Sequence, residues 1–164
     1  MSNWLIDFSS NAFIVSFLLY CVSFIMYAFA VMGRRFRKRD PEVHMAKWGK
    51  IAFVTATIGL AGHLVYFFTR WAGSGHVPVS NMYEFMSFLS MTIMIAFLVL
   101  YFLYKKSMLG LFALPMTILI MAYAAVFPQQ VQPLIPSLQS YWLGIHVTLA
   151  SLGDASSSSD LLPA

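Results

Sequence analysis

Four long apolar stretches constrain this chain more than any other feature of its sequence. They cover residues 11–32, 51–71, 83–104 and 108–127, and a helix needs about 20 apolar residues to cross the hydrocarbon core of a bilayer. Hydrophobic residues make up 60% of the chain and charged residues 10%, a balance typical of membrane proteins. Backbone groups in hydrocarbon must be hydrogen-bonded within their own segment, so we expect an all-α integral membrane protein with four transmembrane helices.

A fifth apolar stretch, residues 141–152, is about a dozen residues long and too short to cross a bilayer. It leads into the tail 154–164, which contains four consecutive serines. We therefore expect a truncated fifth helix, a membrane domain over residues 1–153, and a disordered Ser-rich tail. On this interpretation the chain is cut short within a larger helical bundle.

Basic residues set the expected orientation. Seven of the ten Lys and Arg residues lie within 33–50 and two more within 105–107, whereas Arg70 stands alone at the border of the second loop. The positive-inside rule places these two loops in the cytoplasm and leaves loops 72–82 and 128–140, with the N-terminus, outside. The basic cluster is then a topology anchor that also attracts anionic lipid, and not a nucleic-acid-binding surface.

Aromatic residues near the ends of the stretches are expected to mark the two membrane surfaces. With this orientation an outer belt is predicted from Trp71, Tyr83, Tyr141 and Trp142, and Trp48 lies on the inner side.

Cys21 is the only cysteine of the chain. It can form no intrachain disulfide, and the chain has no C-x-x-C-H sequence for covalent haem attachment. Thiol redox chemistry within this chain is therefore excluded. We expect no cleavable signal peptide, because the first apolar stretch is too long and has no basic segment before it.

The connection between the second and third stretches is rich in turn-forming and polar residues. Gly73, Gly75 and Pro78 predict a turn, and Asn81 can cap the next helix with Glu84 three residues later, as in a capping box. This explanation leaves out His76, which a turn does not require. His76 can have a function at this loop, or it can simply be a solvated histidine at the membrane surface; the sequence favours neither.

The fourth loop is uncharged and Pro-rich, and it leads into an aromatic pair followed by a histidine. His146 follows Trp142 by four residues, so both lie on one face of a helix that enters the membrane. A neutral imidazole beside an aromatic shelf suits the axial position of a haem iron. A histidine that is merely hydrogen-bonded at the interface is the simpler explanation of the same spacing.

His63 lies about two turns inside the second stretch. Ionisable residues at this depth usually face the bundle interior or a cavity. The residue can bond a backbone carbonyl or contribute to a cofactor pocket, and the sequence does not choose between them. His44, in the basic loop, is most simply solvated.

Two segments together resemble a known family. One is Gly75-His76-Val-Pro78-Val-Ser80-Asn81-Met-Tyr83-Glu84, and the other, some sixty residues later, is Leu138-Gln-Ser-Tyr-Trp142-Leu-Gly-Ile-His146-Val147. Their sequence and order resemble the CcsA/ResC family of cytochrome c biogenesis proteins. The resemblance covers residues 1–153 of this chain and corresponds to the N-terminal portion of the family's proteins. The tail 154–164 matches nothing in that family.

The resemblance implies a haem-handling subunit of the System II machinery in a bacterial plasma membrane. Members of the family work with a ResB/CcsB-type membrane subunit and present haem at the outer face to the cysteines of apocytochrome c. The haem is b-type, bound non-covalently and transiently. His146 falls on the position of the first external histidine that ligates this haem, with Trp142 as a packing residue. The segment from Gly75 to Glu84, called the motif loop from here on, falls beside the site. The resemblance carries no ligand role to His76 and none to His63.

The chain also departs from the family pattern. The tryptophan-rich external motif, the second external histidine and the later helices with an intramembrane histidine are absent from this sequence. We therefore expect this chain alone to hold haem weakly and not to act as a cytochrome synthase.

Two other classes of function remain open from the sequence. A transporter or channel fragment would use His63 and Glu84 to mark a polar path, although no internal repeat or broken helix is apparent. A membrane scaffold would bind its partner through the Pro-rich loop and the helices.

Overall fold

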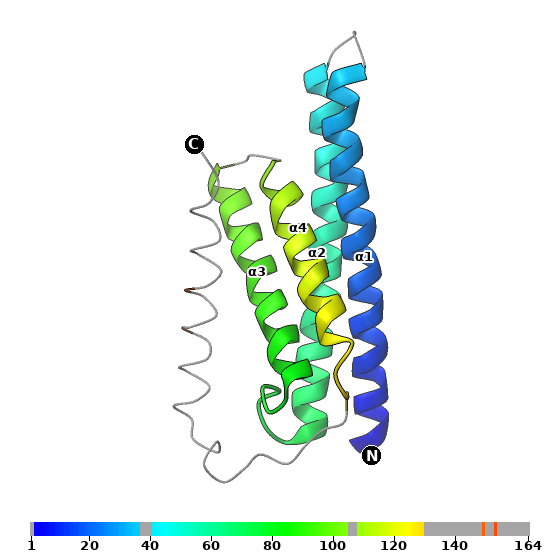
Figure 1. Cartoon of the computed structure of the whole chain (residues 1–164), viewed down its shortest axis with the longest axis vertical. Coiled ribbons are helices and arrows are strands. Elements are labelled where there is room, and N and C mark those ends of the chain that lie inside the picture. The colour runs from blue at the N-terminus through cyan, green and yellow to red at the C-terminus, as the bar shows by residue number, and fades with distance from the viewer. Residues whose placement is uncertain (1, 37–40, 105–107, 130–148, 150–152, 154–164) are drawn as a thin grey trace.

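The computed structural model describes residues 2–36, 41–104, 108–129, 149 and 153. The long described segments form four helices (Figure 1). Their bounds are α1 Ser2–Phe36, α2 Pro41–Ser74, α3 Met82–Tyr104 and α4 Met108–Ala124. The expected all-α membrane architecture is confirmed, while the truncated fifth helix and the boundary at 153/154 fall on or beside residues outside this description.

Successive helices run in opposite directions, so the connections alternate between two ends of the bundle (Figure 1). The N-terminus, the loop between α2 and α3, and the chain after α4 lie at one end. The ends of α1 and α3 lie at the other. This is the alternation that the four apolar stretches predict, and it places the connection between α2 and α3, and the chain up to Gln129, at the same end as the N-terminus.

The first two helices extend well beyond the apolar stretches. α1 begins at Ser2 and not at residue 11, and it continues to Phe36, while α2 begins at Pro41. The basic segment 33–50 is therefore largely helical and not a long loop. Arg, Lys and Glu are good helix formers, and proline is well tolerated in the first turn, so a helix need not end where the hydrocarbon does.

Within the described residues, three helical segments are long and apolar enough to span a membrane: Trp4–Met32, Lys47–Ser74 and Met82–Tyr104. α4 has 17 residues, which corresponds to about 26 Å at 1.5 Å per residue. Beyond it, hydrogen-bonded turns carry the backbone on, because Phe127 N–H donates to the carbonyl of Ala124 at 3.0 Å. The expected fourth span, 108–127, is thus a shorter helix followed by turns.

The buried face of α1 is marked by two rows of residues at seven-residue spacing. One row is small, with Ser9, Ser16, Ser23 and Ala30; the other is aromatic, with Phe13, Tyr20 and Tyr27. Residues seven apart lie on the same face of a helix after two turns. Since small residues let helix backbones approach closely in membranes, the small row explains how α1 packs along α2.

Contacts between specific residues fix the helices against each other. The Ser23 hydroxyl donates to the carbonyl of Ala52 on α2 at 2.7 Å. A Cβ built on Gly62 would lie 2.7 Å from Oγ of Ser16, and one on Gly110 of α4 would lie 2.5 Å from Cε2 of Tyr27. These glycines are therefore positions where two helices are too close for a larger residue.

Candidate functional site

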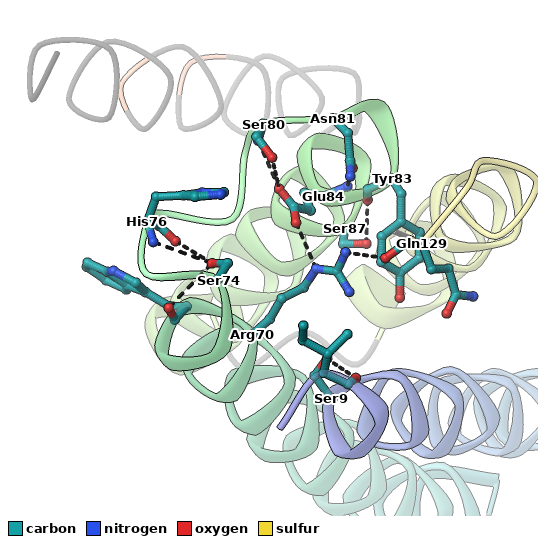
Figure 2. A network of polar contacts seen from close by, with 12 residues as sticks. Ser9, Arg70, Ser74, His76, Ser80, Asn81, Tyr83, Glu84, Ser87 and Gln129 are labelled. Carbon is teal, nitrogen blue, oxygen red and sulfur yellow. Dashed lines mark hydrogen bonds and ion pairs between the residues drawn. The ribbon is translucent and has the colours of Figure 1, made fainter. Parts of the chain in front are cut away.

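A buried arginine joins three parts of the chain at the end of the bundle that holds the motif loop (Figure 2). Arg70 lies in the last two turns of α2 and is fully shielded from solvent. Its Nε donates to Oε1 of Glu84 at 2.8 Å, and its Nη2 donates to the backbone carbonyl of Gln129 at 2.5 Å. The arginine thus connects the end of α2 with the start of α3 and with the chain that follows α4.

Glu84 uses its second carboxylate oxygen to hold the loop before α3. Oε2 accepts hydrogen bonds from the backbone N–H and the hydroxyl of Ser80, at 2.9 and 2.7 Å. The side chain of Asn81 accepts from the backbone N–H of Glu84 at 2.8 Å. The predicted helix cap at Asn81 is therefore confirmed, while the Glu84 carboxylate reaches back to Ser80, the residue before the cap. The sequence did not predict that the capping carboxylate is also the ion-pair partner of Arg70.

One of the three residues predicted to form the turn, Gly73, is not part of it. Gly73 lies inside α2, where a Cβ would meet Ile6 and Leu5 of α1 at 3.2 and 3.3 Å. Gly75 ends the helix in the left-handed region, with φ 75°, and its N–H donates to the carbonyl of Trp71 at 3.0 Å. This is the usual role of glycine just after a helix.

His76 is oriented by its own loop. The Ser74 hydroxyl donates to the carbonyl of His76 at 2.8 Å, and Nδ1 of His76 lies 3.0 Å from the carbonyl of Val77. A carbonyl only accepts, so this contact requires a proton on Nδ1. Pro78 is fully buried beside this turn.

Tyr83 corrects the predicted aromatic belt. Its side chain has 0% exposure, and its ring lies 5.0 Å from the guanidinium carbon of Arg70. A belt residue must face lipid headgroups, whereas Tyr83 faces the interior because Arg70 and Glu84 are there. Trp71 is exposed, as a belt residue should be, and Tyr141 and Trp142 lie outside the described residues.

His63 lies on the same face of α2 as Arg70, seven residues earlier, and is completely buried. Its Nδ1 is 3.5 Å from the hydroxyl of Tyr20 on α1. Its ring packs against Phe13, with the centroids 6.0 Å apart, and against Tyr66, 5.6 Å apart. The expectation that His63 faces the bundle interior is confirmed, and its imidazole contacts both the hydroxyl of Tyr20 and the backbone of Ser87.

Several buried polar atoms of this region make no hydrogen bond of good geometry within the described part of the chain. They are Nε2 of His63, the hydroxyls of Tyr66 and Tyr83, Nη1 of Arg70 and Nε2 of His76. Two of them are imidazole nitrogens, the kind of atom that ligates haem iron. The described residues contain no group of three or more His, Cys, Asp or Glu that could hold a metal ion.

The structure brings together most of the motif-loop residues that the sequence singled out: Ser80, Asn81, Tyr83 and Glu84, with His76 and Pro78 on the adjoining turn. His146 and Trp142 lie outside the described residues, and so does the Pro-rich loop beyond Gln129. The sequence reasoning missed Arg70 as a site residue and took it for a border charge. The available signal was its position seven residues after His63, on the face of α2 that carries the other inward polar residue.

Neither a protein-family model nor a solved structure matches the chain. Several curated proteins do match the chain. The cytochrome c biogenesis protein CcsA of Trieres chinensis is 34% identical over 115 residues, which cover 66% of this chain and 35% of the relative. CcsA of Guillardia theta is 30% identical over 154 residues, covering 89% of this chain and 46% of the relative.

The chain is homologous to the CcsA family. A third member, from Marchantia polymorpha, is 34% identical over 120 residues, covering 64% of this chain and 38% of the relative. This confirms the resemblance read from the two segments. The chain spans less than half the length of these CcsA relatives.

Proposed function

We propose that the chain is a haem-handling membrane component of cytochrome c assembly. The support is its homology to proteins named for cytochrome c biogenesis, together with the two segments that resemble the haem-presenting part of the CcsA/ResC family. In this proposal His146 is an axial ligand of a non-covalent b-type haem, and Trp142 packs against the porphyrin. The haem supplies the iron porphyrin that an apocytochrome receives; this chain supplies an imidazole and an apolar surface.

The observation that carries the proposal is that the motif loop is joined to Gln129, the start of the segment that leads in sequence toward residues 138–147. The motif loop folds around Glu84, and the chain that leads toward residues 138–147 begins at Gln129, whose carbonyl accepts from Arg70. A haem held at that end would be reached from one membrane surface, which is what delivery to a partner protein needs.

We further propose the membrane, the partner subunit and the acceptor with which the chain works. The end with the motif loop faces outward from a bacterial plasma membrane, a ResB/CcsB-type subunit of a System II machinery contributes the rest of the haem site, and apocytochrome c is the acceptor. The basic residues within 33–50 anchor the opposite end near anionic lipid. No nucleic acid takes part.

A transport path through His63 and Glu84 has less support. Glu84 is paired with Arg70 at 2.8 Å, with neither side chain exposed, so its charge is neutralised inside the bundle. A carboxylate in a fixed ion pair with two further hydrogen bonds from Ser80 is built to hold a structure.

Purified chain in detergent, titrated with haem, tests the proposal. We expect weak binding because one of the two axial positions lacks the family's second external histidine. His146→Ala should abolish it. His44→Ala is the matched control, since it removes the same side chain from α2 near the opposite end, and it should change nothing. A low-spin bis-histidine spectrum that survives His146→Ala would refute the ligand assignment.

A further inference from the structure

We infer that Arg70 is a positioning residue, which sets the path of the chain after α4 relative to the motif loop. Resting on the proposed function, we further infer that haem binding through His146 depends on this contact at Gln129, from which the chain continues toward residue 146. One guanidinium donates hydrogen bonds to two partners from different parts of the chain, Glu84 and Gln129.

The two hydrogen bonds of Arg70 use different nitrogens of a rigid plane. Nε pairs with Glu84 and Nη2 with Gln129. The guanidinium holds its donors in a fixed fork, so the separation between the Glu84 carboxylate and the Gln129 carbonyl is set by the arginine. A lysine has one nitrogen on a flexible stem and cannot reproduce that spacing.

The partner at Gln129 is a backbone atom, so the bond fixes the path of the main chain whatever side chain stands there. This hydrogen bond also lies beyond the end of α4, where helical hydrogen bonds no longer hold the backbone. The hydrogen-bonded turns after α4 stop at Phe127, and Pro128 has no N–H to continue them. A charge-assisted bond is stronger than a neutral one, so Arg70 is well suited to hold this segment.

The rest of the network connects the same arginine to the motif loop. Glu84 binds Ser80 with its second oxygen, and Asn81 caps the helix that carries Glu84. A shift of the loop therefore moves the carboxylate, and through Arg70 it moves the carbonyl of Gln129.

The charges argue against a second interpretation, in which Arg70 binds an acidic group of a ligand. Its charge is already balanced by Glu84 inside a region shielded from solvent. Adding an anion would leave a net negative charge there, which is costly in a medium of low dielectric constant. The free Nη1 can accommodate a neutral acceptor without that cost.

Distance measurement by pulsed electron paramagnetic resonance tests the positioning directly. Spin labels are placed at Trp71→Cys and Gln129→Cys in the full chain carrying Cys21→Ser; the Gln129 substitution keeps the carbonyl. Arg70→Lys keeps a positive charge for Glu84 but loses the second donor nitrogen and its fixed spacing from the first, and we expect a broader distance distribution. Arg34→Lys, the same change in the last turns of α1, is the matched control and should leave it unchanged. An unchanged distribution in Arg70→Lys would overturn the positioning role.

Haem binding tests the second half of the inference. We expect Arg70→Lys to raise the haem Kd about tenfold and to alter the spin-state spectrum, with helical content retained. If the distance distribution broadens while the Kd and spectrum stay unchanged, the link to His146 is wrong. If His146→Ala leaves haem binding intact, the proposed function fails, and the distance measurement still decides the positioning.

A second variant covers the case in which Arg70→Lys does not fold. Arg70→Gln combined with Glu84→Gln removes both charges and allows the two amides to bond each other. It lacks the donor that reaches Gln129, so the distance distribution should broaden as in Arg70→Lys. A distribution as narrow as that of the unsubstituted chain would refute the positioning role.

Discussion

Arg70 and Glu84 lie 14 residues apart in the chain and form an ion pair of 2.8 Å in which neither side chain is exposed. Two opposite charges brought out of water are tolerated together because each compensates the other. Removing one of them leaves the other buried without a counter-charge. Substitution of either residue alone should therefore lower the stability of the chain.

Glu84→Ala should destabilise the chain by about 3–5 kcal/mol, because it leaves the Arg70 guanidinium buried and unpaired. Arg70→Met should cost a similar amount for the reciprocal reason. The double variant Arg70→Met with Glu84→Leu should be less destabilised than the sum of the two single variants. Unfolding in mixed SDS and mild detergent, followed by tryptophan fluorescence, measures all three, and simple additivity would contradict the coupling.

Asn81→Ala should cost about 0.5–2 kcal/mol, the usual effect of losing a helix N-cap. The side chain accepts from the N–H of Glu84 at 2.8 Å, and alanine has no acceptor to replace it. Asn81→Ser keeps an acceptor and should recover most of the stability in the same unfolding assay. Equal losses in both variants would argue against capping as the reason.

Gly110→Ala should destabilise the packing of α4 against α1 by about 1–3 kcal/mol, the range for overfilling a packed site. The new methyl would lie 2.5 Å from Cε2 of Tyr27 and 2.6 Å from its Cζ. Gly153→Ala is the control, because a Cβ there meets nothing within 4 Å. Tyr27→Leu in the Gly110→Ala background removes the obstructing ring edge and should restore part of the loss.

Ser23→Ala should cost about 0.5–1.5 kcal/mol, as expected for one net hydrogen bond. The hydroxyl bonds the carbonyl of Ala52 on the neighbouring helix at 2.7 Å. Ser16→Ala is matched to it one heptad earlier on the same buried face, where the hydroxyl bonds Ala12 of its own helix at 2.7 Å. The Ser16 variant should cost less, since no hydrogen bond between helices is lost.

Cysteine labelling with a membrane-impermeant maleimide should react at Gly75→Cys and Pro128→Cys from outside the cell, in the Cys21→Ser background. Lys106→Cys should react only from the cytoplasm. The reason is the concentration of basic residues within 33–50 and 105–107. Cytoplasmic labelling of position 128 would reverse the predicted orientation, and an external His146 with it.

Local rules were sufficient for some features of this chain. The apolar stretches predicted the helices because hydrocarbon forces every backbone group to bond within its own segment. The cap at Asn81 and Glu84 was predictable because its partners are three residues apart. The extension of α1 to Ser2 and of α2 to Pro41 was missed, since hydropathy marks the part of a helix inside the bilayer and not the part beyond it.

The direction in which each side chain faces was decided by the tertiary structure. In a soluble helix, apolar residues mark the buried face; in a helix apolar on all sides, lipid and interior cannot be told apart by hydropathy. Tyr83 was therefore assigned to the surface and Arg70 to the border, although both are buried. Arg70 faces inward toward Glu84 and Gln129, and Tyr83 lies against Arg70. These partners meet only when α2, α3 and the chain after α4 pack together.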